Sequence, residues 1–185
     1  MFIEFSEEQT MLSDSAEKYL RDNYTFDRRQ AIVKQPRGFC AEHWQMFADL
    51  GWLAMTFSED AGGFGGGALE TMILCEQFGK HLVLEPYLES VVLVGGLIER
   101  GASAAIQEQV LSGIVSGELQ GAFAYLEEGR VADPWSVATH AKKDGDDFVI
   151  EGNKTVVLNG PEADFFIVSA RTGTSDTASL DNISL

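Results

Sequence analysis

Residues 44–79 read WQMFADLGWLAMTFSEDAGGFGGGALETMILCEQFG, and the interpretation of the whole chain is built around this segment. Apolar side chains recur at helical spacing in residues 44–50 and again in residues 69–79. Gly51 follows the first run, and glycine is typical of the position just after a helix C-terminus. The glycine-rich run 62–67 is therefore predicted to connect two helices.

The glycine-rich run also fits a dinucleotide-binding motif. Residues 63–68, GFGGGA, match the pattern GxGxxA, and Glu85 and Glu89 follow at about the 20-residue distance of the acidic residue in Rossmann folds. Two features disfavour this interpretation: residues 53–57 resemble the end of a helix, and the segment that should form the next parallel strand has the pattern of a buried helix. A Rossmann-type NAD protein is kept only as the weakest hypothesis.

Helical periodicity begins close to the N-terminus. Ser6 and Gln9 have the spacing of a capping box, and the apolar residues that follow them share one helical face. The polar and basic residues 28–37 are predicted to form a solvated loop between helices.

A second group of helical signals follows the glycine-rich run. Pro86 is suited to the first turn of a helix, and the residues from there to Ile98 are apolar nearly all round. We therefore expect this helix to be buried at the centre of a bundle, with Gly95 and Gly96 allowing another helix to approach closely. Ser103 is predicted to cap a last helix.

Beyond residue 117 the pattern changes to short strands. The pair Asp144-Gly145 between two strand-like runs is typical of a β-hairpin. Helices followed by strands indicate two separate modules, so the predicted fold class is α+β. A few short strands standing alone would leave exposed edges, and the β module is therefore interpreted as unfinished. The predicted strands are residues 119–126, 137–143, 148–150, 155–158 and 165–170.

Composition argues against several classes of protein. The 185 residues include 13 basic and 29 acidic side chains, and the net charge of −16 disfavours a nucleic-acid surface or an anionic membrane surface. Cys40 and Cys75 are interpreted as free core thiols in a reducing cytosol, because they lack the spacing of a disulfide framework or a zinc site. No signal peptide or membrane-spanning stretch is recognisable, so we expect a soluble, cytoplasmic protein.

Few residues carry a recognisable catalytic pattern. His43, His81 and His140 are scattered along the sequence, without the spacing of metal ligands or of a catalytic triad. The nucleophile motif GxSxG is absent from the sequence, and no acid–base pair can be selected from spacing alone. No catalytic residue and no metal site is assigned.

Several spaced blocks resemble the acyl-CoA dehydrogenase family. Residues 44–79 are similar to the family's block LGW…PEEYGGxG…EELG, and the β module is similar to its motifs FALTEP, TxA, GxK and NG…AD. The blocks cover essentially the whole chain, and the first of them reassigns the glycine-rich run to a turn between helices. The matching residues are Phe5–Gln9, Leu50–Trp52, Ser58–Gly63, Gly65, Glu76–Gly79, Phe123–Glu127, Thr139, Ala141, Gly152, Lys154, Asn159–Gly160 and Ala163–Asp164.

The resemblance implies an N-terminal all-α helical bundle, residues 1–118, followed by an incomplete middle β-barrel domain, residues 119–185. The family's C-terminal helical domain, which carries the catalytic glutamate, is expected to be absent from this chain. Members of the family bind FAD and oxidise an acyl-CoA thioester to the trans-2-enoyl-CoA. The resemblance thus implies FAD, an acyl-CoA substrate, an electron-transfer flavoprotein or similar acceptor, and a homo- or hetero-oligomer, with this chain alone inactive.

The resemblance also implies which residues meet the cofactor and the substrate. Backbone N–H groups of Tyr125, Leu126 and Leu158 are expected to reach the flavin edge. The family's GSD is Val131-Ala132-Asp133 here and its WIT is Val156-Val157-Leu158, so a serine, an aromatic ring and a hydroxyl are lost. The implied cofactor-binding residues are Phe123, Tyr125, Leu126, Ala132, Val156, Val157 and Leu158. The implied substrate-binding residues are Tyr87, Ser90 and Val94, for which packing in the core is the alternative.

Two functions stay open. The first is the N-terminal portion of a flavin-dependent acyl-CoA dehydrogenase, without the catalytic base. The second is a non-catalytic subunit of a heteromeric acyl-CoA dehydrogenase, which the lost flavin contacts favour. Residues 84–90, LEPYLES, support the second, because they resemble the small subunits of such assemblies, of which pimeloyl-CoA dehydrogenase is one.

Overall fold

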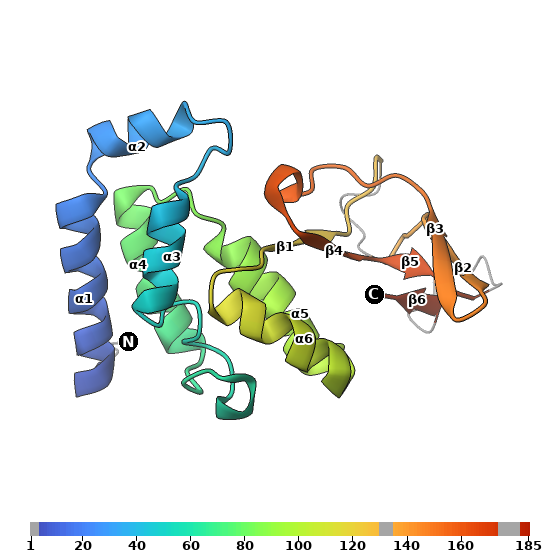
Figure 1. The fold of residues 1–185 in the computed structure, drawn as a ribbon, viewed down its shortest axis with the longest axis horizontal. Helices are drawn as coiled ribbons and strands as arrows, with labels where there is room; N and C mark the ends of the chain where they lie inside the picture. Colours follow the sequence, from blue (N-terminus) through green and yellow to red (C-terminus); the bar gives the residue numbers. More distant parts are fainter. Residues whose placement is uncertain (1–3, 130–134, 174–181) are drawn as a thin grey trace. The chain divides into compact units, whose positions relative to one another are not determined.

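The computed structural model of the chain describes residues 4–129, 135–173 and 182–185. The chain divides into two compact units, Met1–Gln120, here the helical unit, and Gly121–Leu185, here the β unit (Figure 1). Helices fill the first and strands the second, so the α+β fold class is confirmed.

The helical unit contains α-helices, one 3₁₀ turn and one π-helix. None of the helices in the described ranges combines the length and the apolar composition that a membrane crossing requires. In chain order they are α1 (Glu7–Asn23), α2 (Phe26–Val33), α3 (Ala41–Asp49), the 3₁₀ turn η1 (Glu59–Ala61), α4 (Ala68–His81), the π-helix η2 (Tyr87–Gly95), α5 (Gly96–Gly101) and α6 (Ala104–Val115).

Helix α1 begins with the predicted capping box. The backbone N–H of Gln9 donates to Ser6 Oγ at 3.2 Å, and the backbone N–H of Ser6 donates to Gln9 Oε1 at 3.0 Å. The Gln9 amide also donates to Glu70 Oε1 at 2.8 Å, which joins the start of α1 to α4. Leu12, Ala16 and Leu20 are buried along one face, as the apolar spacing predicted.

The prediction of a loop over residues 28–37 is wrong in its first half, because α2 covers Phe26–Val33. Its N-cap is Thr25, whose hydroxyl oxygen accepts the backbone N–H of Arg28 at 3.3 Å. Ile32 is fully buried and fixes the helix to the rest of the unit. A capped helix of two turns with one buried anchor has too little apolar periodicity to be recognised in the sequence.

An aromatic cluster forms the centre of the helical unit. The rings of Phe47 and Phe78 stack with 5.1 Å between their centroids, and Trp52 lies 5.0 Å from Phe47 and 5.7 Å from Phe78. Tyr87 contacts the edge of Phe78 at 5.1 Å. Ring pairs at these distances add stabilisation beyond the apolar area that they bury. Three of these four rings belong to the segment 44–79, and the fourth lies just beyond it.

The glycine-rich run folds back on the residues before it. The backbone N–H groups of residues 63–66 donate to carbonyl oxygens of residues 54–58, at 2.7–3.2 Å, and the N–H of Gly67 donates to Glu70 Oε2 at 2.7 Å. A Cβ on Gly63 would overlap the Phe57 carbonyl, and one on Gly66 would lie 2.6 Å from Met55 O. A phosphate cradle needs free N–H donors and no carboxylate at the helix start, so this run does not form one.

The helix expected after Pro86 is a π-helix, η2, that continues directly into α5. Pro86 itself is the N-cap. Burial is confined to one face of η2, because Leu88 and Leu93 are 51% and 45% exposed, so the expectation of a helix buried all round is only partly correct. A close approach is present at Gly95, where a Cβ would overlap the ring of Phe57, but Phe57 lies in no helix, so the neighbour is not the helix that was predicted.

The end of α4 and the start of α6 lie close to the residues that the sequence indicated. Helix α4 runs past Gly79 to His81 and ends at Leu82, which adopts the left-handed conformation at φ 55°. Ser103 is the N-cap residue of α6 with an extended backbone, but its side chain makes no capping hydrogen bond. The sequence therefore predicted where these helices begin and end more accurately than it predicted the hydrogen bonds at their ends.

The β unit has two small sheets among its described residues. Strands β1 and β4 pair in parallel, with Gly121 opposite Phe165 and Ala124 opposite Val168. The second sheet has the order β3-β2-β5-β6, in which β2 and β3 form the predicted hairpin; its turn is Gly145-Asp146, one residue later than the predicted Asp144-Gly145, because Asp144 pairs with Asp147. The strands are β1 (Gly121–Ala124), β2 (His140–Asp144), β3 (Asp147–Glu151), β4 (Phe165–Val168), β5 (Ala170–Arg171) and β6 (Ile183–Ser184).

The predicted strand at residues 155–158 is wrong. Val156 has φ 49°, outside the extended region, and the chain turns at Leu158 and Asn159 before the 3₁₀ turn η3 (Gly160–Glu162). The β-branched residues made this segment resemble a strand. A single tertiary hydrogen bond, from Thr155 N–H to Leu126 O at 2.9 Å, ties it to the end of β1 instead.

We predict that Gly95→Ala lowers the free energy of unfolding by about 1–3 kcal/mol, because the added methyl group overpacks the core against Phe57. The matched control is Gly79→Ala in α4, where no atom lies within 4 Å of the added Cβ. That variant should gain up to about 1 kcal/mol from the helix propensity of alanine. Urea denaturation measures both, and equal stabilities would contradict the close approach.

Candidate functional site

The residues expected beside a flavin come from two segments that the structure brings together. One segment is Phe123–Leu126, at the end of β1, and the other is Val156–Leu158. The hydrogen bond from Thr155 to Leu126 joins them side by side. The rings of Phe123 and Tyr125 stack on each other, with centroids 4.8 Å apart and planes 23° apart. Ala132, also predicted as a cofactor contact, lies outside the described residues.

These two segments, here the wall segments, expose apolar side chains and unused donors. Tyr125, Val156 and Leu158 are 37%, 67% and 58% exposed. The backbone N–H groups of Tyr125, Leu126 and Leu158 have no partner among the hydrogen bonds of the described residues. Apolar side chains beside free N–H donors suit a flat aromatic group with polar atoms along one edge, which is the chemistry of an isoalloxazine ring.

A buried carboxylate, Glu127, lies immediately after the first wall segment. Its Oε2 accepts the N–H of Ala138 at 2.7 Å. Its Oε1 accepts the N–H of Thr139 at 3.0 Å, the hydroxyl of Thr139 at 2.7 Å and the ammonium of Lys154 at 2.8 Å. Both charged side chains are almost inaccessible, at 6% for Glu127 and 8% for Lys154. The carboxylate is therefore fully hydrogen-bonded, as a buried charge requires.

The ammonium of Lys154 extends this cluster to the β4–β5 junction. It donates to Ser169 Oγ at 2.9 Å in addition to Glu127. Gly152 lets the lysine-bearing segment approach closely, since a Cβ there would lie 2.7 Å from Thr139 Cα. The cluster of Glu127, Thr139, Lys154 and Ser169 thus connects four separate segments of the β unit, and we name it the Glu127 cluster.

Burial by itself would raise the pKa of the Glu127 carboxyl. The hydrogen bonds from Lys154, from the Thr139 and Ala138 backbone and from the Thr139 hydroxyl outweigh burial and lower this pKa from its ordinary 4.5 to about 2. The group is thus a carboxylate throughout the physiological range, and its charge is used to hold Lys154.

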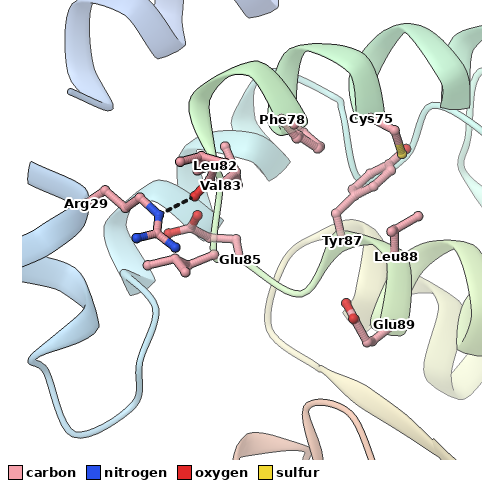
Figure 2. Close-up of a pocket in the computed structure, with 11 residues that line it drawn as sticks. Arg29, Cys75, Phe78, Leu82, Val83, Glu85, Tyr87, Leu88 and Glu89 are labelled. Carbon is pink, nitrogen blue, oxygen red and sulfur yellow. Dashed lines mark hydrogen bonds between the residues drawn. The ribbon is translucent and has the colours of Figure 1, made fainter. Parts of the chain in front are cut away.

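A second site lies in the helical unit, around the predicted substrate residue Tyr87. A cavity of about 400 Å³ is lined by α4, by the turn after it and by the first residues of η2. Figure 2 shows the Tyr87 ring reaching toward Cys75 of α4, while Arg29 and Glu85 lie at the other side. The Nε of Arg29 donates to Leu82 O at 2.9 Å.

The three predicted substrate residues share the buried face of η2. Tyr87, Ser90 and Val94 are 2%, 0% and 0% exposed. Tyr87 lines the cavity, whereas Ser90 and Val94 are not among its lining residues. The Tyr87 hydroxyl is buried and has no hydrogen-bond partner within the described residues, and burial raises its pKa. Their role in substrate binding stays a prediction.

Glu85 is a buried carboxyl beside this cavity, and the sequence did not identify it as a site residue. Only 5% of the residue is exposed, and its Oε1 accepts the N–H of Cys40 at 3.1 Å. Burial raises the pKa of this carboxyl, in contrast to Glu127, because no cation bonds to it among the described contacts. Sequence reasoning had considered Glu85 as the acidic residue of a dinucleotide motif and as part of the segment LEPYLES, but not as a buried carboxyl beside a cavity.

The Glu127 cluster was also missed as a unit, although Glu127, Thr139 and Lys154 each fell within a matching block. The available signal was a glutamate directly after one segment predicted to meet the flavin and a lysine two residues before the other. The ion pair between Glu127 and Lys154 could be predicted only if the two segments were known to meet. Their spacing along the chain does not show this. In the described ranges no group of three or more His, Cys, Asp or Glu is arranged to hold a metal ion.

We predict that the β unit loses stability as the pH falls from about 5 to about 2. A lowered carboxyl pKa adds stability that is complete above the unfolded value and disappears toward the folded value, at most about 3 kcal/mol for Glu127. Hydrogen exchange at Ala138 and Thr139, corrected for intrinsic rates, reports this loss. Glu127→Gln should be less stable at neutral pH and nearly flat over the same range; parallel profiles would refute the assignment.

We predict opposite effects for two matched tyrosine changes. Tyr87→Phe should raise the free energy of unfolding by about 1 kcal/mol, because it removes a buried hydroxyl without a partner. Tyr24→Phe should lower it by a similar amount, because the Tyr24 oxygen accepts the backbone N–H of Leu84 at 3.0 Å. Thermal and urea unfolding measure both, and a loss of stability in Tyr87→Phe would show that its hydroxyl is satisfied.

Comparison with known proteins gives consistent matches. The acyl-CoA dehydrogenase N-terminal domain profile matches residues 6–118, and the middle domain profile of the same family matches residues 122–185. Mitochondrial isovaleryl-CoA dehydrogenase of Pongo abelii is 30% identical over 170 residues, which make up 90% of this chain and 40% of that protein. Acyl-CoA dehydrogenase FadE27 of Mycobacterium tuberculosis is 32% identical over 158 residues, 80% of this chain and 38% of that protein.

Solved structures agree with these matches. The ChsE4-ChsE5 complex from Mycobacterium tuberculosis is similar with a TM-score of 0.84 and 29% identity, over 95% of this chain and 47% of that chain. The Tcur3481-Tcur3483 steroid ACAD is similar with a TM-score of 0.82 and 26% identity, over 96% of this chain and 47% of that chain. The chain thus spans less than half the length of these relatives. By sequence and by fold, it belongs to the acyl-CoA dehydrogenase family.

Proposed function

We propose that this chain is the N-terminal and middle part of a flavin-dependent acyl-CoA dehydrogenase, which introduces a double bond between the α and β carbons of an acyl-CoA thioester. In this proposal residues 1–118 are the N-terminal helical domain and residues 119–185 the beginning of the middle β-barrel domain. The observation that carries it is the juxtaposition of the two wall segments, joined by the Thr155–Leu126 hydrogen bond at 2.9 Å.

The wall segments are proposed to hold FAD. Tyr125, Val156 and Leu158 would cover apolar parts of the ring, and the free N–H groups of residues 125, 126 and 158 would bond to its polar edge. Phe123 supports Tyr125 by stacking, and Val157 and Ala132 complete the proposed contacts. The chemistry that bound FAD supplies is the acceptance of a hydride. What the chain itself contributes is orientation of the ring and exclusion of water from one side of it.

No residue of this chain is proposed as the catalytic base. The carboxylate of Glu127 is occupied by four hydrogen bonds, and that of Glu85 lies buried in the helical unit, where Cys40 N–H bonds to it. Proton removal from the α carbon is therefore assigned to a group outside these residues, and the chain alone is proposed to be inactive. Electrons would pass to an electron-transfer flavoprotein or a similar acceptor.

The acyl group is proposed to meet the face of η2 that carries Tyr87, Ser90 and Val94. The partly open cavity beside Tyr87, of about 400 Å³, is within the size range of small-molecule sites. Its lining combines apolar side chains with two carboxylates, Glu85 and Glu89, against one cation, Arg29, which suits an acyl chain better than the phosphates of CoA.

A second function is favoured by particular residues: a non-catalytic subunit of a heteromeric acyl-CoA dehydrogenase. Val156-Val157-Leu158 offers neither an aromatic ring nor a hydroxyl to a flavin. Two of the similar solved structures are of paired proteins, ChsE4-ChsE5 and Tcur3481-Tcur3483. In either case we propose a homo- or hetero-oligomer in the cytoplasm, a location consistent with the free thiols of Cys40 and Cys75.

The visible absorption spectrum of the purified protein tests the proposal. The protein is isolated as its natural gene product, together with any subunit that accompanies it, and the spectrum is recorded before and after addition of FAD and removal of the excess. A retained flavin spectrum that an acyl-CoA bleaches under anaerobic conditions supports the dehydrogenase. A colourless chain that joins a flavin-bearing homologue supports the non-catalytic subunit, and a colourless chain without such a partner contradicts both.

A further inference from the structure

We propose that Glu127 and Lys154 are positioning residues, which fix the two wall segments relative to each other so that both can meet one flavin. This inference rests on the proposed flavin site. It assigns to the Glu127 cluster a role in the binding of the cofactor, beyond its role in the folding of the β unit.

The first step is the place of the ion pair in the chain. Glu127 is the residue after Leu126, where the first wall segment ends, and Lys154 is two residues before Val156, where the second begins. The contact of 2.8 Å between Lys154 Nζ and Glu127 Oε1 lies next to the backbone hydrogen bond from Thr155 to Leu126. One charged contact and one backbone contact therefore link the wall segments at adjacent positions.

The second step is that the ion pair is itself held from two other directions. The carboxylate of Glu127 accepts three further hydrogen bonds, from Ala138 and Thr139. The ammonium of Lys154 donates also to Ser169, at the end of β4. Neither side chain can change rotamer without breaking a buried charge-assisted hydrogen bond. The ion pair therefore holds the wall segments in a fixed position relative to the sheet.

Strand pairing holds the wall segments only in part. Phe123 and Ala124 belong to β1, which pairs with β4, whereas Tyr125, Leu126 and residues 156–158 belong to no strand. Tyr125, Val156 and Leu158 are more than a third exposed. Val156 keeps a positive φ of 49°, which a β-branched residue adopts only where its surroundings impose it. Binding groups need to be held to within about 0.5 Å for a well-defined site, and the Glu127 cluster includes residues that adjoin both segments in the chain.

The test compares FAD affinity with folding in isosteric variants of the intact protein, including any natural partner subunit. Glu127→Gln and Lys154→Met remove one charge each with little change of volume, and Lys154→Arg keeps the charge. Lys142→Met is the matched control, because Lys142 is an exposed lysine of β2 in the same unit. The FAD dissociation constant is measured by quenching of flavin fluorescence, at a temperature where circular dichroism shows each variant folded.

We expect Lys154→Met and Glu127→Gln to weaken FAD binding at least about tenfold, the size that loss of an outer-sphere partner has at metal sites. Lys154→Arg should recover most of the affinity, and Lys142→Met should match the wild type. Hydrogen exchange of residues 123–126 and 154–158 should increase together in Lys154→Met. If either isosteric variant unfolds, Thr139→Val, which removes one hydroxyl donor to Glu127, takes its place with a smaller expected loss.

Two outcomes separate this inference from the function on which it rests. Folded variants that bind FAD as tightly as the wild type, with lowered melting temperature only, overturn the positioning role and leave the flavin site standing. A wild-type protein, intact with its natural partner, that binds no FAD overturns the flavin site, and the positioning role falls with it.

Discussion

A buried carboxylate is the constraint on which the β unit depends. Glu127 accepts four hydrogen bonds from three residues, and one of its partners, Lys154, reaches a fourth segment of the unit at Ser169. A charge with so little solvent costs several kcal/mol to bury unless every lone pair is satisfied, and loss of one partner leaves the others facing an unpaired charge. The short strands around Glu127 contribute few backbone hydrogen bonds between strands. Hydrogen bonds of side chains therefore contribute much of the stability of this unit.

The helical unit is organised by apolar packing and by the close approach of backbone to backbone. Phe47, Trp52 and Phe78 make the aromatic centre, and the glycine-rich run lies against residues 54–58 with its N–H groups already bonded. Glycine is required at Gly63 and Gly66 because a Cβ would meet carbonyl oxygens there. The same composition that suggested a phosphate site is thus explained by the packing of a tight connection between helices.

Membership of the acyl-CoA dehydrogenase family and the geometry of the β unit point in the same direction. The chain carries matches to the N-terminal and middle domains over less than half of its relatives' length, and the part that we propose for it is one side of a flavin site. Its own contribution, in the proposal made above, is to position a ring and to present an apolar helix face. In the segment 156–158, the backbone N–H of Leu158 has no partner among the hydrogen bonds of the described residues.

The sequence by itself determined the α+β class, the capping box of α1, the hairpin around Gly145 and the family, because each is a local pattern or a set of spaced motifs. The sequence predicted a loop where α2 forms, stabilised by one cap and the buried Ile32. It also predicted a strand at residues 155–158, where a hydrogen bond to Leu126 replaces strand pairing. The tertiary structure alone decided that Glu127 meets Lys154, that the glycine-rich run has no free donors, and that η2 buries one face only. Those outcomes depend on contacts between different segments of the chain, and such contacts produce no periodic pattern in the sequence of either segment.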